Sequence, residues 1–66
     1  MLLPHKYQFK LQQYVDSDII KEELLYELMP YYYSYKRMKS ISSTENMEVF
    51  RLLKIIFEDK YPEYII

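Results

Sequence analysis

The chain has 66 residues, a formal net charge of −1 and a half-hydrophobic composition, with no cysteine and a single histidine. This length allows one domain with a small core, and the apolar content excludes a fully disordered chain. The absence of cysteine excludes disulfides and thiolate metal sites, one histidine cannot form a histidine metal cage, and the net charge provides no overall basic field for nucleic acid.

Glycine is also absent, which limits the possible folds. Hairpin turns and phosphate-binding loops depend on glycine for positive φ angles or for close approach of the backbone. We therefore expect an all-α fold over one domain, residues 1–66, and exclude P-loops and dinucleotide fingerprints. No apolar run approaches the ~20 residues that span a bilayer, and the first residues lack a signal-peptide core. We expect a cytoplasmic protein, in its own cell or a host's, with no membrane partner.

The first segment with a helical pattern covers about 5–15, and Pro4 suits a first helical turn. Apolar residues with the spacing i, i+4, i+7 and i+8 are Tyr7, Leu11, Tyr14 and Val15. A strand is the alternative, because apolar and polar residues alternate through Tyr7, Phe9 and Leu11. We favour a helix because no neighbouring segment offers a strand to pair with.

A second helix is predicted to begin at the Asp-Ser-Asp cluster at 16–18, because these residue types are good N-caps. Its apolar stripe at i, i+4 and i+8 consists of Ile20, Leu24 and Leu28. Pro30 disfavours the α conformation at Met29, so the helix is predicted to end there.

A third helix is predicted for 31–39, with Pro30 at its first position. One face carries Tyr31, Tyr35 and Met38, and another carries Tyr32, Lys36 and Lys39. Residues 16–28 hold five acids against one base, whereas 31–40 hold three bases and no acid. If these blocks form neighbouring helices, we expect them to neutralise each other, with a small gain in stability because exposed ion pairs are weak.

A fourth helix is predicted from about 43 to 60, and Ser42 with Glu45 forms a capping box at its start. Eight of the eleven residues in 47–57 are apolar, which exceeds the stripe of an ordinary surface helix. This helix is therefore expected to be buried on two sides, one of which is a candidate contact with a second copy. Pro62 ends it, and the final isoleucines are expected to fold back or to dock on another chain. The predicted self-association residues are Val49, Phe50, Leu53, Ile56, Phe57, Tyr64 and Ile65. Overall we predict a bundle of three to four short helices with a long hydrophobic C-terminal helix.

Catalytic patterns are weak. Asp18 and Glu22 lie at i and i+4, but a solvated acidic face is far commoner than a paired catalytic site. His5 is isolated near the chain start, and the serines have no neighbouring base. We predict that the protein is not an enzyme and needs neither a metal nor a cofactor.

Tyrosine is unusually frequent, with nine residues, four of them within 31–35. Tyrosine is enriched in binding hot spots because it offers a large, rigid area and a polar tip. Nine hydroxyl groups cannot all find buried partners in so small a core, so several are expected at the surface. The predicted partner-binding residues are Tyr31, Tyr32, Tyr33, Tyr35, Lys36, Arg37 and Lys39.

The favoured function is a small non-catalytic regulator or inhibitor that docks on a larger protein. The expected partners are that larger protein, a second copy of this chain, or both. Phage-encoded inhibitors and small bacterial regulators have this size and class. The alternative is a small dimeric DNA- or RNA-binding regulator, in which tyrosines of 31–39 stack on bases and the neighbouring cations neutralise phosphates.

Overall fold

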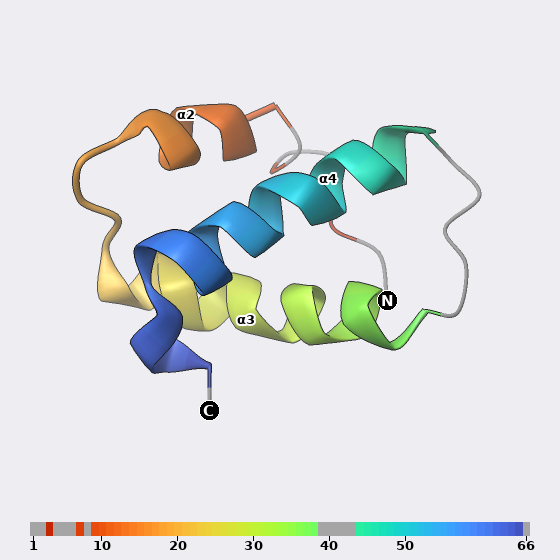
Figure 1. Ribbon diagram of the computed structural model, residues 1–66. Helices are drawn as coiled ribbons and strands as arrows, with labels where there is room; N and C mark the ends of the chain where they lie inside the picture. Colours follow the sequence, from red (N-terminus) through yellow and green to blue (C-terminus); the bar gives the residue numbers. More distant parts are fainter. Residues whose placement is uncertain (1–2, 4–6, 8, 39–43, 66) are drawn as a thin grey trace.

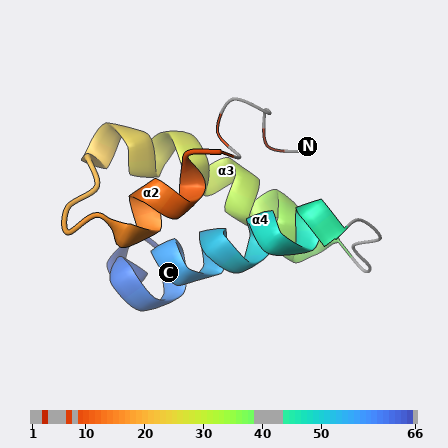
Figure 2. The same ribbon diagram turned by 90° about the horizontal axis from the view of Figure 1, so that it is seen from above.

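The computed structural model describes residues 3, 7, 9–38 and 44–65. Its elements are the α-helices α2 (Leu11–Asp16), α3 (Glu22–Arg37) and α4 (Thr44–Lys54), the π-helical turn η1 (Ile55–Lys60) and the 3-10 turn η2 (Pro62–Tyr64). No strand occurs within these residues, so the all-α prediction is confirmed for them. α3 and α4 run antiparallel, and α4 contacts both α2 and α3 (Figures 1 and 2).

The core is a single cluster built mainly by α3, α4 and η1. Its buried side chains are Leu3, Leu11, Ile20, Leu25, Leu28, Tyr32, Tyr35, Val49, Leu52, Leu53, Ile56 and Phe57. The four that α3 contributes are spaced three or four residues apart, which places them on one face of the helix. No charged side chain is buried among the described residues.

α3 runs without interruption through Pro30, so the predicted helix boundary at Met29 is wrong. A proline within a helix removes one backbone hydrogen bond, here the one to the Tyr26 carbonyl, and commonly bends the helix. Pro30 and Tyr26 both lie on the exposed side of α3. Burial of Leu28 and Tyr32 on the opposite face, before and after the proline, offsets the local cost.

The charges of α3 are consequently arranged along one helix instead of facing each other across two. Glu22 and Glu23 occupy its first turn and Lys36 and Arg37 its last. Glu27 and Lys36 are nine residues apart, or about 14 Å along the axis, which is too far for an ion pair. Among the described residues, the two blocks therefore do not form the pair of neighbouring helices on which the expected neutralisation depended. Glu22 and Glu23 instead complement the helix dipole at the start of α3, and Lys36 and Arg37 complement it at the end.

Within the first segment, the helical prediction is confirmed for 11–15, while its start at His5 lies outside the described residues. Leu11 is fully buried, and Tyr14 and Val15 are half-buried. α2 extends to Asp16, and α3 begins only at Glu22. The predicted helix start at 16–18 is therefore wrong, because these residues form the end of α2 and the connection that follows.

The connection between α2 and α3 is held by the C-terminal part of the chain. Tyr61 N–H donates to the Ile56 carbonyl at 2.9 Å, and this i to i−5 bond closes the π-helical turn. Beyond it, the Tyr61 hydroxyl accepts a 2.8 Å hydrogen bond from Ile20 N–H. The Lys60 ammonium donates to the carbonyls of Val15 and, at 2.7 Å, Ser17. The side chain of Ile20 is thereby buried in a loop rather than on the predicted helical stripe.

The predicted fourth helix is divided into α4, which has 11 residues, and the six-residue η1. The structure therefore does not show the predicted single long hydrophobic helix. Ser42 of the predicted capping box lies outside the described residues. The two-sided burial arises within one chain, because α2 and α3 both pack against α4. Of the two expectations for the chain end, folding back describes the structure up to the half-buried Ile65, whereas Ile66 lies outside the described residues. Tyr64 lies edge-on to Tyr26 of α3, with ring centroids 5.6 Å apart.

We expect Pro30→Ala to raise the free energy of unfolding by about 2–3 kcal/mol. An interior proline costs about 3 kcal/mol relative to alanine, and the more restricted unfolded chain returns up to about 1 kcal/mol of this. Urea denaturation followed by circular dichroism measures the change. Pro62→Ala is the control, because Pro62 begins a 3-10 turn where its missing N–H costs nothing. A loss of stability in Pro30→Ala would contradict a continuous α3.

Lys60→Met is expected to lower the free energy of unfolding by about 1.5–3 kcal/mol, the range for a hydrogen bond to a charged group. Methionine retains an apolar stem but leaves the Val15 and Ser17 carbonyls without their donor. Lys54→Met is the matched control, since the exposed Lys54 ammonium contacts only the face of the Phe50 ring in the described part of the chain, a contact worth less than about 1 kcal/mol. Equal effects of the two changes in urea denaturation would refute the role assigned to Lys60.

Candidate functional site: a tyrosine-rich hollow on α3

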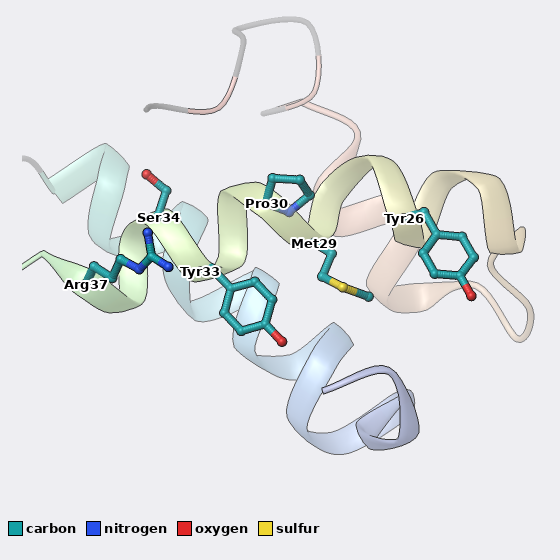
Figure 3. A pocket seen from close by; sticks show the side chains of 6 residues that line it. All are labelled: Tyr26, Met29, Pro30, Tyr33, Ser34 and Arg37. Atoms are coloured by element: carbon teal, nitrogen blue, oxygen red, sulfur yellow. The ribbon is translucent and has the colours of Figure 1, made fainter. Parts of the chain in front are cut away.

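The outward face of α3 carries an open hollow of about 640 Å³. Its lining residues follow the helical spacing i, i+3, i+4, i+7, i+8 and i+11 and are Tyr26, Met29, Pro30, Tyr33, Ser34 and Arg37. Figure 3 shows Met29 between the rings of Tyr26 and Tyr33, with Arg37 at the far end. The hollow exists because α3 continues through Pro30, which aligns residues from both halves of the helix.

Neighbouring rings contact the two tyrosines of the hollow. Tyr26 is 56% exposed, and its ring meets the edge of Tyr64. Tyr33 is half-buried and meets the ring of Tyr32 edge-on, with centroids 5.6 Å apart. Both arrangements are favourable aromatic geometries. The two rings are therefore partly positioned before any partner arrives.

The two ends of the hollow differ in charge. At one end, a hydrogen bond to the Glu22 carboxylate raises the pKa of Tyr26 above its usual value. Burial, followed by the charge of Glu22 and that of Glu63, likewise raises the pKa of Tyr64. At the other end lies the exposed guanidinium of Arg37, next to the exposed Lys36. The hollow is thus acidic near Tyr26 and basic near Arg37.

The predicted partner-binding set is divided by the structure. Tyr33 and Arg37 line the hollow, Tyr31 is half-buried, and Lys39 lies outside the described residues. Tyr32 and Tyr35 are buried core residues, so neither presents a ring to a partner. Lys36 is exposed, with its ammonium 5.7 Å from the centre of the Tyr32 ring.

The hydroxyl groups of the two buried tyrosines have polar partners. The Tyr32 hydroxyl donates to the Glu58 carboxylate at 2.7 Å. The Tyr35 hydroxyl accepts from Leu3 N–H at 3.1 Å and faces Asn46 Oδ1 at 3.5 Å. Burial and the Glu58 hydrogen bond together raise the pKa of Tyr32 to about 12.

Four residues of the hollow were missed by the sequence interpretation: Tyr26, Met29, Pro30 and Ser34. Placing a helix boundary at Pro30 assigned them to two separate helices with unrelated faces. The signal that would have joined them is the unbroken burial spacing Leu25, Leu28, Tyr32 and Tyr35, which leaves Pro30 on the solvent side.

The predicted self-association residues lie mostly inside the chain. Val49, Leu53, Ile56 and Phe57 are buried in the core. Phe50, Tyr64 and Ile65 are only half-buried. Of the predicted set, only these three half-buried side chains are accessible to a second copy. The second side of α4 needs no partner chain, because α2 packs against it.

A scan of protein-family models, a search of curated proteins and a search of solved structures each find no match to this chain. Within the described residues, no helix combines the length and apolarity required to cross a membrane. The same residues contain no group of three or more His, Cys, Asp or Glu side chains placed to hold a metal ion. Function is therefore inferred from the hollow and the side chains that surround it.

The raised pKa of Tyr32 makes stability depend on pH in the alkaline range. An unfolded tyrosine loses its proton near pH 10, whereas folded Tyr32 holds it to about pH 12. The stability that the raised pKa of Tyr32 contributes is therefore fully present below pH 10. It is lost as the pH rises from 10 to 12, because in this range the unfolded chain binds fewer protons than the folded chain.

We expect Tyr32→Phe to lower stability by about 1–2 kcal/mol at pH 8, through loss of the bond to Glu58. We also expect the variant to lose less stability than the unmodified chain between pH 10 and 12. Urea denaturation across this range measures both effects. An unchanged pH slope in the variant would contradict the assignment to Tyr32.

Proposed function

We propose that this protein is a small non-catalytic regulator that binds a larger protein through the hollow on α3. The single observation that carries the proposal is the alignment of aromatic, apolar and cationic side chains in one open hollow on a continuous helix. Tyrosine, methionine and arginine are the residue types enriched in protein interfaces relative to other surfaces. The volume of the hollow, about 640 Å³, falls within the range of sites that bind small ligands. A few side chains of a partner protein occupy a similar volume.

The contacts of the hollow favour binding at a low entropic cost. Tyr26 and Tyr33 are each supported by another ring, and Met29 lies half-buried between them. Side chains that are positioned in advance lose less freedom when a partner docks. The middle of the hollow is therefore suited to receive an apolar anchor, while the hydroxyl tips and the guanidinium surround it with polar groups.

Regulation by occlusion is the mode of action that this surface supports. Among the described residues, the hollow is formed on the outside of a helix rather than in an enclosed cleft, so a partner contacts it with a protruding segment. Covering such a segment blocks its use by other ligands of the partner. The proposed role needs no bond-making chemistry and no cofactor.

Two other roles from the sequence remain as proposals with less support. A nucleic-acid role loses Tyr32 and Tyr35 as stacking platforms because both are buried, although Lys36 and Arg37 are exposed. A homodimer retains only Phe50, Tyr64 and Ile65 of its predicted contacts as half-buried side chains. Light scattering on the purified chain measures the oligomeric state directly.

The test is a nuclease-treated pull-down with two matched variants. Tyr26→Lys places a charge in the hollow, and Met47→Lys places the same charge on α4 at a side chain of equal exposure, 56%. We expect the unmodified chain and Met47→Lys to recover one protein in near-equal amount, and Tyr26→Lys to recover at least about tenfold less, because a desolvated charge in an interface costs several kcal/mol.

Circular dichroism establishes that both variants are folded. Equal recovery by the two variants would contradict docking at the hollow. Recovery that disappears with nuclease treatment would instead support the nucleic-acid alternative.

A further inference from the structure

We propose that the occupant of the hollow is an amphipathic peptide segment of a partner protein with opposite charges at its two ends. A basic residue of the segment lies beside Glu22 and Glu63, and a carboxylate lies beside Arg37. This inference rests on the proposed function, and it adds the chemistry of the partner and the polarity of its charges across the hollow.

The acidic end is defined by contacts around Tyr26. Glu22 precedes Tyr26 by four residues on α3, which places it on the same side of the helix, and it is exposed. The Tyr26 ring contacts that of Tyr64, and the exposed Glu63 is the neighbour of Tyr64 in η2. Two carboxylates thus flank one pair of rings. A cation placed over these rings gains attraction from the carboxylates and from the aromatic faces.

The basic end is defined by Arg37. Among the described residues, no ion pair engages its guanidinium, although it lines the hollow and is exposed. A guanidinium presents paired N–H donors that match a carboxylate in a bidentate arrangement. The neighbouring Lys36 is also exposed and adds positive charge at this end.

The distance between the two ends sets the length of the occupant. From Tyr26 to Arg37 is eleven residues of α-helix, or about 16 Å. An extended segment of about five residues covers this distance, and Met29, Pro30 and Tyr33 between the ends offer apolar contact for its middle. A polyanion such as nucleic acid fits poorly, because its phosphates at the Glu22 end meet like charge.

The test selects peptides instead of assuming them. A displayed library of random twelve-residue peptides is selected in parallel against the unmodified chain, Arg37→Glu and Lys10→Glu. Lys10 is exposed and precedes α2, so Lys10→Glu changes the net charge equally without altering the hollow. Amide chemical-shift mapping with one selected peptide then locates its binding site on the unmodified chain.

The unmodified chain and Lys10→Glu are expected to enrich peptides with an aromatic or aliphatic middle, an acidic residue towards one end and a basic residue towards the other. Arg37→Glu is expected to enrich peptides with basic residues at both ends. It is also expected to bind the peptides selected on the unmodified chain about tenfold more weakly, because an attraction becomes a repulsion.

Selected peptides that map to the hollow but share no charge pattern would overturn this inference while leaving the proposed function standing. The same holds if Arg37→Glu enriches the same peptides as the unmodified chain. Enriched peptides that map elsewhere, or no enrichment at all, would overturn the inference, and the pull-down with Tyr26→Lys then decides separately whether the proposed function also fails.

Discussion

Tyr32 and Tyr35 lie at the centre of the core, and each must place a hydroxyl group on a polar partner because buried polar groups without partners are costly. Tyr35 meets this demand with Leu3 N–H and Asn46, and Tyr32 meets it with Glu58. These contacts tie α3 to the start of the chain, to α4 and to η1. In a chain without cysteine, directional bonds at the ends of large rings restrict how the helices slide, which apolar contacts alone do not do.

A second set of contacts joins the end of the chain to its first half. The π-helical turn brings both Lys60 and Tyr61 to the connection between α2 and α3, where they bind carbonyls and an N–H group that lack helical partners. Tyr7 adds a contact from its hydroxyl to Glu27 of α3, which raises the pKa of Tyr7 to about 12. The connection between α2 and α3 is thus held by side chains that come from the distant end of the chain.

These tethers allow α3 to serve two purposes. One face supplies the buried stripe from Leu25 to Tyr35, and the outward face supplies the hollow. Adjacent tyrosines accordingly have different roles. Tyr32 is a core residue, whereas Tyr33 packs against the Tyr32 ring and lines the hollow. A rigid core face behind the hollow keeps its rings in position, and this is the physical basis for proposing that a partner docks there.

The sequence by itself determined the helical class and the apolar helical spacing that includes the buried Leu11, but it did not determine which tyrosines are buried: Tyr32 and Tyr35, predicted to bind a partner, lie in the core. Local composition suffices for these features, since glycine is absent and apolar residues recur at helical spacing. The continuity of α3 through Pro30 was decided only by tertiary structure. Local sterics favour a break before proline, but the continuous buried stripe of α3 against the core outweighs that preference. The hollow depends on this outcome, because Tyr26 and Arg37 share a face only when the helix continues between them. The site was therefore not predictable from local patterns, whereas most of the core that supports it was.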